Sequence, residues 1–358
     1  MNNRKGRRNK RVVLSLVALF CSLWMAIGCH REEGGRFSND HNRQGKRVVG
    51  RGHETPALTS GPPAVTFGDK FYDVAVQGQQ VWVVGYFGAV THSKDGGKTW
   101  ERQDPGTRAS LLGVSFINEK AGWIVGDQGT IFHTGDGGVK WEPQKSPVMD
   151  QKLLKVQFLN EKDGFAVGAF GTILHTVDGG KTWERSAFKE DIILNDLVFL
   201  NPKVGWVAGE FETILHTTDG GKTWQKQRGG QEGKLFGLAF LDGKQGIAVG
   251  TAGKALLTVD GGKSWKETKS ATPDTLLKVH FYGNAQALAV GLRGALIVSS
   301  DNGQTWSPVT IPHHYTWLSG LAFNSSGVGF LVGDHGTILT SSDSGKSWVP
   351  TGLIPPGR

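Results

Sequence analysis

The sequence TVDGGKTW at residues 176–183 occurs seven times along the chain with small changes. The other copies cover residues 93–100, 134–141, 217–224, 258–265, 299–306 and 341–348. Successive copies start 41 or 42 residues apart, and so regular a period indicates one supersecondary unit repeated within a single domain. The aspartates of the motif are Asp95, Asp136, Asp178, Asp219, Asp260, Asp301 and Asp343.

Residues 153–185 show what one repeat contains. Residues 153–159 alternate in polarity and are rich in β-formers, and residues 165–168 and 172–176 are further short apolar runs. Asn, Asp and Gly separate these runs, and residues 182–185 lead out of the repeat. Four short strands per repeat are typical of a propeller blade. Seven repeats therefore predict an all-β, seven-bladed β-propeller of four-stranded antiparallel blades with Asp-box turns.

The Asp-Gly-Gly turn, which we call the Asp box, has a structural explanation. Its carboxylate can accept bonds from backbone N–H groups that follow it, and the glycines supply the positive φ that other residues resist. The Trp five residues after each Asp can enter the outer strand and bury its ring across the hairpin. Because these residues recur in every repeat, we interpret the seven aspartates as scaffold rather than as calcium or catalytic sites.

The N-terminus predicts export and a lipid anchor. Residues 4–11 contain six Lys and Arg, residues 12–28 are mostly apolar, and Cys29 follows a run of small residues that resembles a bacterial lipobox. The pattern favours a lipoprotein, with plain secretion or a retained membrane anchor as alternatives. The second cysteine, Cys21, lies in the apolar run, so no thiol chemistry is expected in the mature propeller.

These features predict three segments. We expect a lipoprotein-type signal peptide at residues 1–28, a flexible tether with lipidated Cys29 at residues 29–60, and the propeller at residues 61–358. The protein is then expected outside the cytoplasm, lipid-anchored to a membrane on its periplasmic or cell-surface side.

The net charge of +8 comes from the N-terminal segment. Residues 1–51 hold 12 Lys and Arg against three Asp and Glu, whereas the rest of the chain holds 28 against 29. The propeller is therefore close to neutral, and its charge gives no indication of a nucleic-acid partner.

Residues 125–141, 167–183 and 332–348 carry a narrower pattern than the Asp box alone. They read VGDQGTIFHTGDGGVKW, VGAFGTILHTVDGGKTW and VGDHGTILTSSDSGKSW. With this pattern, the chain over residues 67–354 resembles the photosystem II stability and assembly factors of oxygenic phototrophs and their relatives in non-photosynthetic bacteria. The resemblance implies a seven-bladed propeller, often a lipoprotein, that holds a newly made reaction-centre protein without known catalysis.

The sequence departs from that family at its arginines. The resemblance implies an arginine-rich client-binding patch, but outside the tether the arginines are scattered over the repeats. They are Arg102, Arg108, Arg185, Arg228, Arg293 and Arg358. We therefore expect a protein client, a membrane protein or complex subunit, bound by a monomer, and leave open whether it belongs to a photosystem.

Each repeat has a Gly-x-x-Gly turn whose central residues differ from repeat to repeat. We expect these turns and the loops between repeats on the face opposite the Asp boxes, although Glu212 replaces the second Gly in the fourth repeat. Aromatic rings at turn tips indicate a contact surface, unless they fold back onto a neighbouring blade. The predicted partner-binding residues are Tyr86, Phe87, Arg108, Phe170, Phe211, Arg293 and His335.

The histidines do not predict a metal site, and no cofactor is expected. His133, His175 and His216 recur at one position of three repeats, with His92 close to that position in the first. Equivalent positions on separate blades lie too far apart to ligate one metal, so we expect a structural role on the third strand. We place the adjacent pair at residues 313–314 on a surface loop.

Two other functions fit an Asp-box propeller. A sialidase-like glycosidase needs an arginine triad and a Tyr nucleophile paired with a Glu, whereas Tyr72 and Tyr282 fall in predicted innermost strands and no triad is evident. A glycan-binding envelope protein could instead use the aromatic turn tips for sugar stacking. We interpret the chain as a binding module rather than an enzyme.

Overall fold

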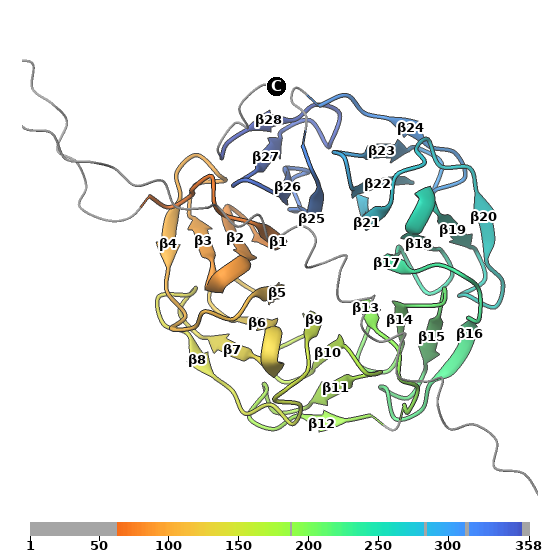
Figure 1. Ribbon diagram of the computed structural model, residues 1–358, viewed down its shortest axis with the longest axis horizontal. Helices are drawn as coiled ribbons and strands as arrows, with labels where there is room; N and C mark the ends of the chain where they lie inside the picture. The colour runs from red at the N-terminus through yellow and green to blue at the C-terminus, as the bar shows by residue number, and fades with distance from the viewer. Residues whose placement is uncertain (1–62, 187, 283–284, 312–314, 353–358) are drawn as a thin grey trace, which may run out of the picture. The chain divides into compact units, whose positions relative to one another are not determined.

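The computed structural model describes residues 63–186, 188–282, 285–311 and 315–352 (Figure 1). These residues form seven four-stranded antiparallel sheets, arranged as blades around a central axis. The prediction of an all-β, seven-bladed propeller is confirmed. The predicted signal peptide, Cys29 and the tether lie outside the described residues, as do residues 313–314. No helix among the described residues has the length and apolar character needed to cross a bilayer.

Each blade is one continuous stretch of chain whose strands run in order from the axis outward. Blades 1 to 4 contain β1 (Phe71–Gln77), β2 (Gln80–Gly85), β3 (Val90–Ser93), β4 (Glu101–Gln103); β5 (Leu111–Phe116), β6 (Gly122–Gly126), β7 (Ile131–Thr134), β8 (Glu142–Pro143); β9 (Leu153–Phe158), β10 (Gly164–Gly168), β11 (Ile173–Thr176), β12 (Glu184–Arg185); and β13 (Leu194–Phe199), β14 (Gly205–Gly209), β15 (Ile214–Thr217), β16 (Gln225–Arg228).

Blades 5 to 7 follow the same plan. They contain β17 (Leu235–Phe240), β18 (Gly246–Gly250), β19 (Ala255–Thr258), β20 (Lys266–Thr268); β21 (Leu276–Tyr282), β22 (Gln286–Gly291), β23 (Leu296–Ser299), β24 (Ser307–Pro308); and β25 (Leu318–Phe323), β26 (Gly329–Gly333), β27 (Ile338–Ser341), β28 (Val349–Pro350). Three short 3-10 turns join the second and third strands of blades 1, 2 and 5: η1 (Tyr86–Gly88), η2 (Asp127–Gly129) and η3 (Thr251–Gly253).

Within residues 63–352 the ring closes without a strand shared between its two ends. β1 packs against β25 as every other innermost strand packs against its neighbour. The Ser319 hydroxyl donates to the carbonyl of Phe71 at 2.8 Å, and the Asn324 amide donates to the carbonyl of Gly78 at 2.9 Å. Residues 64–67 add no strand to the last blade; there the Thr66 N–H is capped by the Asp69 carboxylate at 2.7 Å.

The antiparallel strand order gives the ring two different faces. The Asp boxes join third to fourth strands and lie beside the loops that join first to second strands, as the bond from the Gly96 N–H to the Gln79 carbonyl shows (2.9 Å). The Gly-x-x-Gly turns and the loops between blades lie on the opposite side, as predicted. We call these the box face and the turn face.

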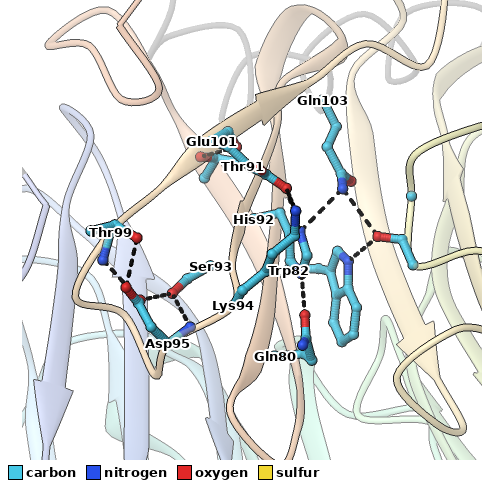
Figure 2. Close-up of polar contacts among 12 residues, drawn as sticks. Gln80, Trp82, Thr91, His92, Ser93, Lys94, Asp95, Thr99, Glu101 and Gln103 are labelled. Carbon is cyan, nitrogen blue, oxygen red and sulfur yellow. Dashed lines mark hydrogen bonds and ion pairs between the residues drawn. The ribbon is translucent and has the colours of Figure 1, made fainter.

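The Asp box is a closed set of hydrogen bonds (Figure 2). Asp95 Oδ1 accepts from the Thr99 N–H at 2.8 Å, and its Oδ2 accepts from the Thr99 hydroxyl at 2.6 Å. The Ser93 hydroxyl donates to Asp95 at 2.8 Å and accepts from the Gly97 N–H at 2.8 Å. The Thr99 hydroxyl and then its N–H lower the pKa of Asp95 to about 2, since both bonds favour the carboxylate.

Stacked rings fill the seams between blades. Trp123 of blade 2 lies flat on Phe158 of blade 3, with ring centroids 3.5 Å apart, and Trp183 meets Phe158 edge-on at 5.7 Å. The Trp123 indole N–H donates to the carbonyl of Gly179 in the neighbouring Asp box at 3.1 Å. Trp183 is buried as predicted, although it lies one residue before the outer strand β12. The same stack recurs with Trp82–Phe116, Phe165–Phe199 and Trp206–Phe240.

The repeated histidines belong to these stacks. His133 packs on Trp123 at 4.8 Å and His175 on Phe165 at 4.2 Å, each from the third strand of its blade. His92 lies between the side chains of Gln80 and Gln103 (Figure 2). Burial lowers the pKa of all four rings, which are His92, His133, His175 and His216. Their predicted structural role is confirmed.

Candidate functional site

Close backbone approach requires both glycines of the turn-face turn in blades 1, 2, 3 and 5, and blade 1 shows why. A Cβ on Gly85 would lie 2.1 Å from the carbonyl oxygen of Lys70, and one on Gly88 would lie 2.0 Å from that of Thr107. Gly88 also has a positive φ of 73°. The innermost strand and the following inter-blade loop therefore clamp the turn between them, and the two residues at its tip are held rigidly.

The second tip residue is left-handed in every blade. Its φ lies between 53° and 58°, a conformation that costs a residue with a Cβ about 1–2 kcal/mol. The seven residues are Phe87, Gln128, Phe170, Phe211, Ala252, Arg293 and His335. None of them is glycine, and three are phenylalanines, for which such a backbone is a marked outlier. Strain of this kind is typical of functional positions.

The predicted aromatic residues are exposed. Phe87, Phe170 and Phe211 each expose 54% of their surface, and Tyr86 exposes 49%. Every exposed large aromatic side chain among the described residues, Phe67 included, belongs to the turn face, whereas the exposed large apolar side chains of the box face are aliphatic, such as Val139 and Val177. The two faces therefore differ in chemistry as well as in topology.

The structure distributes the predicted residues over the turn face. Tyr86, Phe87 and Arg108 come together at blade 1, where the Arg108 guanidinium lies 5.2 Å from the centre of the Phe87 ring. Phe170 and Phe211 stand on blades 3 and 4. On blade 6 the Arg293 side chain is 83% exposed, with one amino group 3.2 Å from Asp274. On blade 7 His335 lies 3.0 Å from Asp334 and packs on Phe67, which precedes the first blade.

Three acidic residues occupy the first tip position, and the sequence analysis did not single them out. Asp127 lies 3.1 Å from the ammonium of Lys152, and Glu210 lies 2.8 Å from that of Lys234. Each lysine stands at the start of the following blade, so the pairs tie neighbouring blades together on the turn face. Asp334 holds the third of these positions, beside His335.

Glu212 fills the place of the missing glycine. It has a φ of 51°, exposes only 2% of its surface, and forms ion pairs with Arg228 and Lys254. Burial opposes ionisation of its carboxyl, but Arg228 and Lys254 outweigh burial and lower the pKa of Glu212. Ion pairs therefore hold the fourth turn at the position where blades 1, 2, 3 and 5 have a close-packed glycine.

A ring of charges lies around the axis, and sequence reasoning missed it. The third residue of each innermost strand reads Asp73, Gly113, Lys155, Asp196, Gly237, Lys278 and Gly320 in blade order. Lys155 Nζ lies 2.6 Å from Asp73 Oδ2, and Lys278 Nζ lies 3.0 Å from Asp196 Oδ2. In both pairs the carboxylate also accepts an N–H from the intervening blade, from Val114 at 3.1 Å and from Leu238 at 2.9 Å.

The glycines of this ring make the bridges possible. A Cβ on Gly113 would lie 3.0 Å from the Cα of Lys155, and one on Gly237 would lie 2.9 Å from the Cα of Lys278. Burial disfavours a charged Lys155, but Asp73 and Asp196 outweigh it and raise the pKa of Lys155. Burial, followed by the two lysines, lowers the pKa of His280 to about 4. The axis is thus lined by two Asp–Lys ion pairs, in one of which burial lowers the pKa of Lys278, and by a neutral imidazole.

The described residues hold no group of three or more His, Cys, Asp and Glu side chains that could bind a metal ion. Tyr72 and Tyr282 lie on the innermost strands β1 and β21, as predicted. Tyr72 stacks on Trp317 at 5.7 Å, and burial, then Asp127, raises the pKa of its phenol. Such surroundings disfavour the phenolate that a Tyr nucleophile would need.

A protein-family comparison identifies the repeats. The family model described as "Photosynthesis system II assembly factor YCF48" matches residues 103–192, 144–231 and 230–316, which together cover more than half of the chain. The chain belongs to the YCF48 family. Two solved YCF48 structures share its fold. "YCF48 bound to D1 peptide" has a TM-score of 0.64 at 22% identity, over 80% of this chain and 98% of that one. YCF48 from Cyanidioschyzon merolae has 0.64 at 20% identity, over 76% and 95%.

Propellers with other functions share the architecture as well. The GH74 xyloglucanase from Xanthomonas campestris has a TM-score of 0.67 at 12% identity, over 80% of this chain and 55% of that one. At this identity the likeness concerns the fold alone. A comparison with curated proteins found no match to the chain.

Proposed function

We propose that this member of the YCF48 family is a non-catalytic assembly factor that holds a membrane-protein client on its turn face, outside the cytoplasm. Membership of the family supports the role, and the relative solved with a D1 peptide supports a protein client from a membrane complex. Lipidation at Cys29 would keep the protein beside its client.

One observation carries the choice of face: the tip residue of each Gly-x-x-Gly turn is strained, exposed to different degrees and different from blade to blade. The flanking glycines repeat, and the tips between them change from Phe87 to Gln128, Ala252 or His335. A scaffold repeats its residues, whereas recognition requires differences. Rigid turns also lower the entropy lost on binding, because the tips are ordered before the client arrives.

The arginines of the propeller are engaged in contacts within the chain, so they do not by themselves indicate a photosystem client. Arg102 bridges to Asp69 at 2.9 Å and Arg228 pairs with Glu212, so both are engaged within the propeller. Arg185 donates to the carbonyl of Phe170 at 2.8 Å. Arg102 and Arg108 belong to blade 1, and the other described arginines stand on blades 3, 4 and 6, so they do not gather into the arginine-rich patch that the family resemblance implies. The client surface should accordingly depend less on acidic groups.

Site-specific crosslinking tests the face. A photoreactive residue is placed at Gln128 or Ala252 on the turn face, and at Val177 or Val259 on the box face as matched controls. After irradiation in native membranes, the turn-face positions should capture a membrane protein and the box-face positions should not. Equal capture from both faces, or none from the turn face of a folded protein, contradicts the proposal.

Two further measurements test the anchor and the absence of catalysis. Palmitate labelling of the full chain should be lost in a Cys29→Ser variant, and an unlabelled protein with Cys29 intact would remove the lipid anchor from the proposal. Turnover of a fluorogenic sialoside or of xyloglucan would instead favour an enzyme.

A further inference from the structure

Five exposed aromatic rings share one face of the propeller. They are Phe67, Tyr86, Phe87, Phe170 and Phe211, each between 47% and 54% exposed. Met149, 71% exposed in the loop between blades 2 and 3, stands on the same face. Tyr86, Phe87, Phe170 and Phe211 belong to blades 1, 3 and 4, Phe67 packs on the tip of blade 7, and Met149 lies between blades 2 and 3.

The rings are spread out rather than gathered into one pocket. Phe87, Phe170 and Phe211 hold the same position of equivalent turns with the same φ of 56°, so the repeat places the three rings at equivalent heights on the turn face. Protein hot spots cluster near the centre of an interface. Rings that are separated but lie at the same height can all contact one partner only if its surface is flat and extended.

Cationic side chains accompany the rings. The Lys70 ammonium lies 5.7 Å from the centre of the Tyr86 ring, and the Arg108 guanidinium lies 5.2 Å from that of Phe87. Arg185 donates to the carbonyl of Phe170. An aromatic ring with a cation beside it suits the interface of a bilayer, where the ring enters below the headgroups and the cation meets the phosphates.

The chain also joins the propeller at this face. Phe67 packs on His335, the tip of blade 7, with ring centroids 4.5 Å apart, and the carbonyl of Asp69 accepts from the Gly336 N–H at 2.8 Å. The segment that would connect the propeller to Cys29 therefore starts from the turn face. A flexible tether that leaves from this face lets the turn face meet the membrane without the chain first passing around the propeller.

We propose that the aromatic tips of the turn face insert into the interface of a lipid bilayer and orient the propeller on it. The inference rests on the proposed function and deepens it. The rings at blades 1, 3 and 4 contact lipid, while the polar tips, such as Gln128 and Arg293, meet the segments that the client extends from the membrane. The turn face thus contacts both the client and the bilayer in which the client lies.

Vesicle binding of residues 61–358 tests the proposal without the N-terminal apolar segment or Cys29. Residues 60–358 form a compact unit, and all strands of the seven blades lie between Phe71 and Pro350, so this fragment contains the whole ring. Its binding is measured by co-sedimentation with phosphatidylcholine vesicles, with and without phosphatidylglycerol. The test variant is Phe87→Ser/Phe170→Ser/Phe211→Ser. The matched control, Val139→Ser/Val177→Ser/Val259→Ser, removes three exposed apolar side chains from the box face.

The fragment should bind, more strongly with phosphatidylglycerol, and the turn-face variant should lower its partition coefficient by about tenfold or more. The box-face control should bind as the parent does. Since the fragment has no cysteine, Phe170→Cys and Val177→Cys can each be labelled with an environment-sensitive dye. Only the dye at residue 170 should shift to the blue with vesicles.

Failure of the parent fragment to bind, or an equal loss in both triple variants, overturns the inference. Crosslinking from Gln128 in a detergent extract reports on the client separately. If the turn-face variant abolishes that crosslink but binds vesicles normally, the rings contact protein, so this inference is wrong and the proposed function stands. If vesicle binding follows the expectation and no client is captured, the proposed function fails and the membrane contact stands.

Discussion

Lys155 of blade 3 reaches across blade 2 to Asp73 of blade 1, with Nζ 2.6 Å from Oδ2. The intervening blade presents Gly113 and donates the Val114 N–H to the same carboxylate. Three blades are thus joined at one carboxylate. Lys278, Gly237 and Asp196 repeat the arrangement over blades 4 to 6.

Removing the cation should expose the cost of burying Asp73. Lys155→Met leaves a carboxylate with 5% of its side chain exposed and no cation, and we expect a loss of about 3 kcal/mol in the free energy of unfolding. Asp73→Asn/Lys155→Met should recover much of this loss, because the amide oxygen can still accept from Val114. Denaturant titration measures both. A Lys155→Met variant as stable as the parent would show that the ion pair between Lys155 and Asp73 is not needed for stability.

The glycines of the axial ring should not tolerate a methyl group. Gly113→Ala places a Cβ 3.0 Å from a backbone Cα that cannot move aside freely, and overpacking of this kind costs about 1–3 kcal/mol. Gly135→Ala is the matched control, because no atom lies within 4 Å of the added Cβ. The expected result is a lower melting temperature for Gly113→Ala alone.

Acid should weaken the hydrogen bonds of all the Asp boxes over the same pH range and so lower the stability of the fold. Hydrogen bonds lower the pKa of Asp95, Asp178, Asp219, Asp260 and Asp343 to about 2 from an ordinary 3.8. A depressed pKa in the folded state stabilises above the ordinary value, so this stabilisation is lost as the pH falls from 3.8 toward 2. The melting temperature should drop through that range. Asp178→Asn should make the drop shallower, and an unchanged slope would argue against the boxes as its source.

The tryptophans that stack between neighbouring blades should stabilise the fold through both ring packing and the hydrogen bond of the indole N–H. Trp123→Phe keeps a ring where blade 3 already has Phe165, but loses the bond to Gly179, and we expect a cost of about 1 kcal/mol. Trp123→Ala empties the seam and should cost about 3–5 kcal/mol. Thermal unfolding of the two variants separates the contributions. Equal losses would mean that the ring itself adds little.

The strained tips predict a conflict between stability and binding. Asn tolerates the left-handed region better than Phe does, so Phe170→Asn should raise the free energy of unfolding, by up to about 1 kcal/mol. The same change should weaken vesicle binding because the exposed ring is gone. A variant that loses stability would show that the Phe170 ring packs on the propeller.

Sequence was sufficient for the features that depend on neighbouring residues. The Asp boxes bond within seven residues, and the repeats made the number of blades and the two faces predictable. The pair of Asp73 and Lys155 joins residues 82 positions apart, so no local pattern pointed to it. Its signal was the order of Asp, Gly and Lys at one strand position, which is visible only when the repeats are aligned on their strands. The left-handed φ of Phe170 was hidden too, because it belongs to the geometry of the whole turn and recurs at Phe211, where the second glycine is missing.

The closure of the ring has a consequence for how such proteins can change. Blades 7 and 1 meet through side-chain and strand contacts, like any other pair, and in the described part of the chain neither blade contributes a strand to the other. The point at which the covalent chain is interrupted is therefore arbitrary, and a circular permutant cut between any two blades should assemble the same rosette. Each sequence repeat also coincides with a whole sheet, so a repeat could be gained or lost during evolution without leaving an incomplete blade.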